Sequence, residues 1–215
     1  MQVKNQIYLS PKKRLIMKFV ELDEKLFLGK GGERSSYIHP DDDKKIIKVI
    51  HLQGKHNNQN ELEYAYMKYL EKKCADFSHI IKCYGWIDTN KGRGLIFERV
   101  ENFDKTPMRT LSYYSKFNLL DEQTGLKLIQ DLKEYLFNNS ILFIDASLSN
   151  VFCQKIAENQ YKLIIFDGLG ARRTGIKFWF YLKSSLFTKY KMKKQWKIFL
   201  NNYNYERSLK LKREE

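Results

Sequence analysis

The fold is decided by residues 26–50, which have the sequence LFLGKGGERSSYIHPDDDKKIIKVI. Three apolar residues are followed by a glycine-rich break at residues 29–32, and extended, β-prone residues resume at Ser36. Residues 40–43 (PDDD) are typical of a turn, and residues 45–50 (KIIKVI) of a strand. The stretch therefore predicts a strand, a glycine-rich loop, a strand, a turn and a strand.

The glycine-rich loop suggests a place where phosphate groups bind. Gly29, Gly31 and Gly32 lie between two expected strands, and without Cβ atoms their backbone N–H groups can approach phosphate oxygens closely. No GK[ST] opens a helix after the loop, so it is not of the Walker A type. A glycine-rich turn alone is a common structural feature, so the prediction depends on the residues that accompany it.

Lys48 strengthens the prediction because it lies inside an apolar strand, where a cation must reach solvent or meet an anion. In protein kinases a lysine at this place pairs with nucleotide phosphates and with a glutamate of the next helix. The helix expected at residues 60–72 (NELEYAYMKYLEK) offers Glu61 and Glu63 near its start. Either glutamate has neighbours one turn later on its own face, and we favour Glu61, with Glu63 as the alternative.

A second constellation lies in residues 141–152 (ILFIDASLSNVF). Asp145 and Asn150 interrupt an apolar run and have the spacing of the kinase catalytic loop H-R-D-x-x-x-x-N. An aspartate here can accept the proton of an attacking hydroxyl, and an amide oxygen can bind Mg²⁺ beside the phosphates. The pattern predicts Asp145 as a catalytic residue and Asn150 as a metal ligand.

A third motif follows the strand expected at residues 161–166 (YKLIIF), which ends in Asp167-Gly168. A carboxylate at the end of this strand matches the kinase D-F-G element, whose aspartate binds metal. The interval after Asn150 leaves room for a hairpin that turns at residues 158–159. Asp167 is therefore the second expected metal ligand.

The segment between these motifs predicts the place where a nucleotide base would bind. Residues 94–100 (GLIFERV) are typical of a strand that leads into a hinge. In kinase folds the backbone of the hinge contacts the adenine ring, and Glu98 to Val100 would do so here.

In this order, the elements resemble those of bacterial members of the protein-kinase-like superfamily, and within it the PhoP-regulated YrbL-like family of Gram-negative bacteria. The resemblance covers most of residues 23–170 and is carried by LGKGGERSSYIHPDDDKKIIKVI, NELEYAYMKYL, YGWIDTNKGRGLIFERVENFD, NNSILFIDASLSNVFC and IIFDGLGA. It implies a small bilobal α+β fold that binds ATP and Mg²⁺, while the family's activity and substrate are poorly defined.

The chain also departs from the kinase pattern. Phe143 and Ile144 stand where the catalytic loop has His and Arg, and Ser147 replaces the usual lysine. The missing Arg argues against control by a phosphorylated activation loop. No A-P-E element follows Gly170, and the 45 residues after it are too few for a full peptide-docking helical lobe.

Most of the positive charge lies in the tail, residues 171–215. This tail contains thirteen Lys or Arg, three Glu and ten aromatic residues, and so carries +10 of the net charge of +14. Two helices are expected in it, at residues 176–189 and 193–201. Basic residues with aromatic anchors suit an anionic surface such as a membrane, or nucleic acid as the less favoured partner. The alternative is that the aromatic residues are core and the lysines a solvated face.

Composition limits the setting of the protein. With 43% hydrophobic residues, the chain of 215 residues can bury a core. The three cysteines, Cys74, Cys83 and Cys153, give neither a disulfide framework nor a CxxC metal site. No signal peptide or membrane span is apparent. We expect a cytoplasmic protein, with peripheral binding at the inner membrane as a further option.

The expected organisation is a β-rich lobe at residues 1–100 and a reduced helical lobe with a basic tail at residues 101–215, in which residues 105–141 look helical. The expected function is ATP- and Mg²⁺-dependent phosphoryl transfer to a protein hydroxyl or to a hydroxyl of a cell-envelope sugar or small molecule. Nucleotidyl transfer (AMPylation) stays open. The alternative is a non-catalytic nucleotide-binding module with a partner-binding tail.

Overall fold

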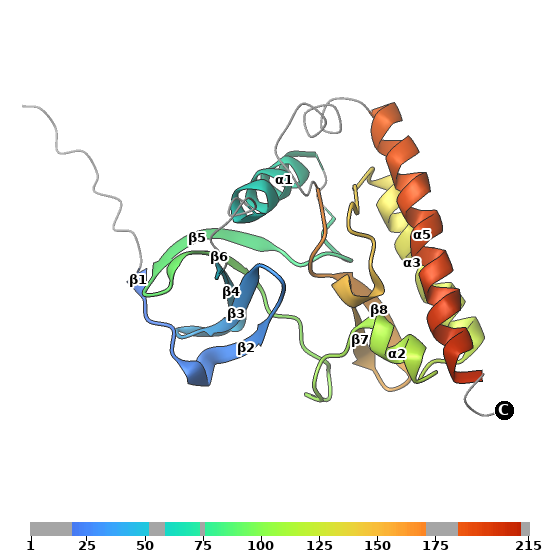
Figure 1. Cartoon of the computed structure of the whole chain (residues 1–215), viewed down its shortest axis with the longest axis horizontal. Helices are drawn as coiled ribbons and strands as arrows, with labels where there is room; N and C mark the ends of the chain where they lie inside the picture. The colour runs from blue at the N-terminus through green and yellow to red at the C-terminus, as the bar shows by residue number, and fades with distance from the viewer. Residues whose placement is uncertain (1–18, 52–58, 74–75, 171–184, 212–215) are drawn as a thin grey trace, which may run out of the picture.

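The computed structural model describes residues 19–51, 59–73, 76–170 and 185–211, and in this part of the chain four of eight strands precede the first α-helix (Figure 1). In chain order the elements are β1 (Phe19–Val20), the 3-10 turn η1 (Glu24–Leu26), β2 (Phe27–Lys30), β3 (Arg34–His39), β4 (Asp42–Ile50), α1 (Gln59–Lys73), β5 (Cys83–Thr89), β6 (Gly92–Glu98), α2 (Leu111–Lys116), α3 (Glu122–Asn138), the 3-10 turn η2 (Leu148–Asn150), β7 (Val151–Ala157), β8 (Gln160–Ile165) and α5 (Ser185–Leu211). The α+β fold class is confirmed.

The N-terminal strands form one curled sheet with the strand order β1-β5-β6-β4-β3-β2 (Figure 1). β1 pairs with β5 in parallel, and the other neighbours are antiparallel. In β4, Ile47 and Val49 belong to a small core inside the curl. Because successive side chains of a strand face opposite sides, Lys48 faces away from that core. The alternation along β4 thus turns Lys48 toward the remainder of the chain.

Helix α1 packs on the sheet and connects it to the C-terminal part. Its buried face includes Glu63, Tyr66, Met67 and Leu70, which follow helical spacing. The Tyr66 hydroxyl accepts a hydrogen bond of 2.7 Å from the backbone N–H of Leu142, which lies just before the predicted catalytic loop. A side chain one turn from Glu63 therefore anchors α1 to that loop.

The C-terminal part consists of α2, α3, the β7–β8 hairpin and α5, with α5 lying along α3 and reaching α2 (Figure 1). Met192, Trp196, Phe199 and Tyr203 form the buried stripe of α5. The ring of Phe199 lies 6.0 Å from that of Phe143. Phe143, at the His position of the predicted catalytic loop, thus serves as a packing contact for α5.

The tail differs from its prediction. Two helices with a break near residues 190–192 were expected, but α5 runs without interruption from Ser185 to Leu211, so the prediction of a break is wrong. Met192 and Trp196 continue one apolar stripe at intervals of three and four residues, and no glycine or proline interrupts it. Residues 176–184 lie outside the described residues.

The other expected elements are confirmed with small shifts. The helix after β4, the strand at residues 92–98 and the hairpin that turns at residues 158–159 are all present. Asn159 has φ of 53°, a left-handed conformation that Asn tolerates in tight turns. Residues 105–141 contain two separate helices, α2 and α3, rather than one helical region.

Two further features bear on the setting. Cys83 and Cys153 are buried free thiols, and Cys74 lies outside the described residues. In the part of the chain that the structure describes, no helix combines the length and the apolar composition that a bilayer crossing requires.

Candidate active site

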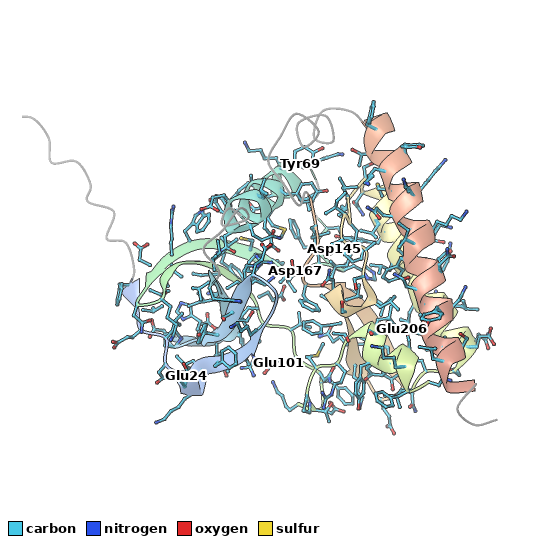
Figure 2. The ribbon with its side chains drawn as sticks, viewed as in Figure 1. Glu24, Tyr69, Glu101, Asp145, Asp167 and Glu206 are labelled. Carbon is cyan, nitrogen blue, oxygen red and sulfur yellow. The ribbon has the colours of Figure 1, made fainter. Side chains whose placement is uncertain are left out.

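A cleft of about 1200 Å³ separates the curled sheet from the C-terminal part. Figure 2 shows Asp145 and Asp167 close to each other at the centre of the molecule, between these two parts. The cleft is lined by all but one of the residues that the sequence predicted for the site, namely Gly29, Gly31, Gly32, Lys48, Glu98, Val100, Asp145, Asn150 and Asp167. Residues distant in the sequence are therefore assembled around one space.

Lys48 is held at the bottom of this cleft and is only 3% exposed. Its Nζ donates a 2.7 Å hydrogen bond to the carbonyl oxygen of Phe166, directly before Asp167. The same Nζ lies 3.7 Å from Oε1 of Glu63 and 4.4 Å from the centre of the Phe97 ring. The lysine thus joins β4, α1 and the Asp-Gly segment.

The predicted residue that lies elsewhere is Glu61. Its side chain is exposed, whereas Glu63 is buried and forms the ion pair with Lys48. The preference for Glu61 is therefore wrong. Glu63 shares its face with Tyr66 and Met67, which are buried against the rest of the protein, while two residues earlier the helix has turned by more than half a turn toward solvent.

Sequence reasoning missed Arg34, which begins β3 and is 7% exposed. Its Nη1 contacts the carboxylate of Glu63 and lies 3.1 Å from Oδ1 of Asn60, and its Nη2 lies 2.8 and 2.9 Å from the two carboxylate oxygens of Asp167. A signal was present in the sequence. In the kinase spacing G-x-G-x-x-G, Gly29 and Gly31 take the first two places and Arg34 takes the third.

The charges around Asp167 set its protonation. Burial by itself raises the pKa of this carboxyl group, but the positive charges of Lys48 and Arg34 and a hydrogen bond from the Gly168 N–H lower it to about 2. In return, although burial opposes the charged form of Arg34, the carboxylates of Glu63 and Asp167 raise its pKa. Asp167 is therefore ionised at neutral pH.

The predicted catalytic loop is fixed by backbone hydrogen bonds to the Asp-Gly segment. The N–H groups of Ile144 and Asp145 both donate to the carbonyl oxygen of Gly168 at 3.0 Å. The side-chain amide of Asn150 donates to the carbonyl oxygen of Asp145, also at 3.0 Å. Gly168 has φ of 84°, and a Cβ at this position would lie 2.8 Å from the Asp145 carbonyl oxygen. Only glycine fits this close approach.

The glycine-rich loop, by contrast, borders open space. The turn is closed by a 2.8 Å hydrogen bond from the Gly31 N–H to the Arg34 carbonyl oxygen. A Cβ added at Gly29 or Gly32 would meet no heavy atom within 4 Å. Packing within the fold therefore gives no reason for glycine at these two positions, and their backbone is accessible from the cleft.

The outer end of the cleft is apolar and borders the predicted hinge. Its walls include Leu28, Ile46, Ile81, Val100, Met108 and Phe152. Within the hinge, the N–H of Glu98 donates to the Lys82 carbonyl oxygen and the N–H of Arg99 to that of Lys44. These two N–H groups are engaged inside the protein, so a base that accepts a hydrogen bond from the backbone of this segment would have to use the Val100 N–H.

The polar end has the chemistry of a magnesium site of the kind that nucleotides complete. The amide oxygen of Asn150 and the carboxylate of Asp167 are hard oxygen donors, and Mg²⁺ commonly takes one or two protein ligands together with phosphate oxygens and waters. Among the described residues, no group of three or more His, Cys, Asp and Glu could form a metal site by itself. The donor set fits Mg²⁺, and in this structure the cation beside Asp167 is Arg34.

The chain is similar to known proteins over most of its length. The model of the family described as "PhoP regulatory network protein YrbL" matches residues 20–204, which is most of the chain. The chain belongs to the YrbL family. It is 27% identical over 154 residues to the "Uncharacterized protein YrbL" of Escherichia coli (strain K12), covering 70% of this chain and 73% of that protein. The YrbL protein of Shigella flexneri matches with the same identity and coverage.

The fold is shared with protein kinases of known structure. The crystal structure of Rad53 residues 1–466 in complex with AMP-PNP superposes with a TM-score of 0.51 at 15% identity, covering 80% of this chain. The chain spans 44% of the length of that kinase chain. At this identity the match concerns the fold, and it confirms the kinase-like fold that the sequence motifs predicted for this YrbL protein.

Proposed function

We propose that this YrbL protein is an ATP- and Mg²⁺-dependent phosphotransferase that modifies a hydroxyl group of a protein, a cell-envelope sugar or another small molecule. The observation that carries the proposal is the convergence of Lys48, Asp145, Asn150 and Asp167 on one cleft, beside a glycine-rich loop. Rad53, the kinase of similar fold, binds AMP-PNP in its crystal structure.

Each end of the cleft suits a different part of a nucleotide. The apolar walls beside Val100 suit an adenine ring, and the accessible backbone of Gly29 and Gly32 suits phosphate oxygens. Lys48, kept in place by Glu63, supplies a positive charge to the phosphates. Mg²⁺ bound by Asn150 and Asp167 would neutralise further phosphate charge.

Asp145 is the proposed base. In the transfer, the acceptor oxygen forms a bond to the γ-phosphorus, the bond from that phosphorus to the β–γ bridging oxygen breaks, ADP leaves, and Asp145 takes the hydroxyl proton. The hydrogen bonds from the N–H groups of Ile144 and Asp145 to the Gly168 carbonyl oxygen fix the backbone that carries the Asp145 side chain at the cleft.

The test is nucleotide-dependent stabilisation with matched lysine variants. ATP with Mg²⁺ at millimolar concentration should raise the Tm of the wild-type protein. When the free nucleotide concentration is 100 times Kd, the free energy of unfolding should rise by about 2.7 kcal/mol. Lys48→Gln should remove this shift. Lys45→Gln, three residues earlier on the same strand, should keep it, because Lys45 pairs with Asp42 near the surface. An unchanged Tm of the wild-type protein with ATP and Mg²⁺ would contradict the proposal.

A second candidate is a non-catalytic nucleotide-binding regulatory module. It is favoured by the apolar Phe143 and Ile144 and by Ser147 in the catalytic loop, since these positions carry His, Arg and Lys in the kinase pattern. Asp145→Asn separates the two. If the protein is an enzyme, this variant binds nucleotide and loses transfer, and its phenotype matches a deletion. If it is a module, the phenotype of Asp145→Asn matches the wild type.

The labelled product separates phosphoryl from nucleotidyl transfer. ATP labelled at the γ-phosphate marks the acceptor in phosphoryl transfer, whereas ATP labelled at the α-phosphate marks it in AMPylation. The proposal requires the γ label in the acceptor and ADP in solution.

The outward face of α5 supports contact with an anionic surface. Phe187, Tyr190 and Tyr205 are 58%, 71% and 64% exposed on this helix, and Lys194 and Lys197 are exposed between them. Amphipathic faces of this composition bind anionic lipid. Vesicles containing phosphatidylglycerol should therefore cosediment the wild-type protein more than the double variant Lys194→Glu, Lys197→Glu, and vesicles of phosphatidylcholine should cosediment neither.

A further inference from the structure

Arg34 binds the carboxylate of Asp167, which is one of the two metal ligands in the proposed function. Its Nη2 lies almost equally far, 2.8 and 2.9 Å, from the two carboxylate oxygens of Asp167. The Gly168 N–H also donates to Oδ1 of Asp167, at 2.7 Å. Both carboxylate oxygens therefore already accept hydrogen bonds, and a metal ion that binds them competes with the guanidinium group.

The net charge of the buried cluster also disfavours a divalent cation while Arg34 binds Asp167. Lys48 and Arg34 are buried cations, and Glu63 and Asp167 are the carboxylates that face them, so the cluster is neutral without a metal ion. A dication added to the cluster as it stands would add positive charge next to a guanidinium. Without Arg34 on Asp167, the same groups would attract it.

We propose that Arg34 is a latch that holds Asp167 until phosphate groups draw the guanidinium away, so that nucleotide binds before the divalent cation. The inference rests on the proposed nucleotide-binding function and adds the order of binding and the residue that sets it. Arg34 acts on the metal site through Asp167 and is a positioning residue in this sense.

The position of Arg34 allows this exchange. It lines the cleft two residues after Gly32, at the end of the glycine-rich loop where phosphates are expected. Guanidinium groups pair with phosphate oxygens through two parallel hydrogen bonds, and a triphosphate carries more negative charge than one carboxylate. Glu63 keeps its ion pair with Lys48 when Arg34 leaves, so α1 stays attached to the sheet.

The latch is tested with Mn²⁺ as the probe, and free Mn²⁺ is measured by electron paramagnetic resonance without nucleotide. Arg34→Gln should bind Mn²⁺ at least ~10-fold more tightly than the wild-type protein, because Asp167 is released. Arg93→Gln is the matched control, since Arg93 is exposed on β6 and stacks on Trp86 outside the cleft. It should leave Mn²⁺ affinity unchanged.

A second measurement follows ADP binding by calorimetry in the presence of EDTA. The wild-type protein should bind ADP without metal, and Arg34→Gln should bind it at least ~10-fold more weakly, because a phosphate ligand is lost. If Arg34→Gln does not fold, Arg34→Lys takes its place. Lysine lacks the planar fork whose two nitrogens reach Glu63 and Asp167 separately, so its hold on Asp167 is weaker and the same directions are expected.

The outcomes separate the latch from the proposed function. If the wild-type protein and the folded Arg34 variant bind Mn²⁺ with equal affinity, the proposal that Arg34 holds Asp167 against metal is wrong, regardless of the ADP affinities. Failure of ADP to bind the wild-type protein under any condition overturns the proposed function, and the Mn²⁺ comparison still decides whether Arg34 holds Asp167 against metal.

Discussion

At the scale of single residues, Glu63 and Glu61 provide a matched pair for the buried charge cluster. They lie two positions apart on α1, yet Glu63 is buried against Lys48 and Arg34 and Glu61 is exposed. Glu63→Gln should lower the free energy of unfolding by about 3 kcal/mol, because it leaves two buried cations, Lys48 and Arg34, with Asp167 as their one remaining carboxylate in the cluster. Glu61→Gln should change it by less than ~0.5 kcal/mol.

Urea unfolding of the two variants at pH 7 measures this difference. Equal stability of Glu63→Gln and Glu61→Gln would mean that the cluster does not hold α1 to the sheet in solution.

Gly168 is the second residue whose role can be isolated. Its left-handed φ of 84° and the close approach of the Asp145 carbonyl oxygen leave no room for a Cβ. Gly168→Ala should cost about 2 kcal/mol or more in unfolding free energy, and it should displace the loop that carries Asp145. Gly32→Ala, where a Cβ meets nothing within 4 Å, should leave stability nearly unchanged. Thermal unfolding of both variants would contradict this explanation if their Tm values were the same.

At the scale of elements, the contact of α3 with α5 holds the tail helix against the rest of the C-terminal part. Gly125 of α3 lies so close to Tyr203 of α5 that an added Cβ would overlap the Tyr203 hydroxyl. Gly125→Ala should therefore destabilise the protein by ~1–3 kcal/mol, even though alanine favours helix.

A double-mutant cycle in urea isolates this contact. In a Tyr203→Phe background the overlapping oxygen is absent, so Gly125→Ala should cost at least ~1 kcal/mol less than it does in the wild-type protein. An equal cost in both backgrounds would place the strain elsewhere.

At the scale of the whole molecule, stability should fall on acidification in two windows. Burial lowers the pKa of His79 from its ordinary 6.5, and its Nδ1 donates to the Leu163 carbonyl oxygen at 2.8 Å. Below about pH 6.5 the unfolded chain therefore takes up a proton that the folded chain resists, and stability decreases. The pKa of Asp167 is lowered to about 2, so its contribution is complete above its ordinary 3.8 and is lost between those values.

Urea unfolding at a series of pH values from 8 to 2 checks both windows. His79→Gln should flatten the upper window and leave the lower one. If the free energy of unfolding falls with the same slope between pH 7 and 5 in His79→Gln and in the wild-type protein, His79 does not cause the loss of stability in the upper window.

Local physical chemistry determined most of the elements and several of the predicted residues. The apolar residues on both sides of Lys48 predicted a strand with a lysine that must reach solvent or meet an anion, and β4 is this strand, with Lys48 paired to Glu63. The pattern from residues 141 to 168 predicted a loop, a hairpin and an Asp-Gly segment, and these are present. Such features depend on neighbours a few positions apart, which the sequence displays directly.

Tertiary packing decided the remainder. Glu61 and Glu63 have equivalent local surroundings, and only the docking of α1 beside Lys48 and Arg34 makes Glu63 the partner. The contact between Arg34 and Asp167 joins residues 133 positions apart, and no local pattern encodes such a pair. The YrbL sequence by itself therefore determined which chemical groups the cleft contains. Only the folded chain decided that Glu63 and Asp167 are the partners of Lys48 and Arg34, because the energy of an ion pair depends on the distance between the charges in space and not on their separation along the chain.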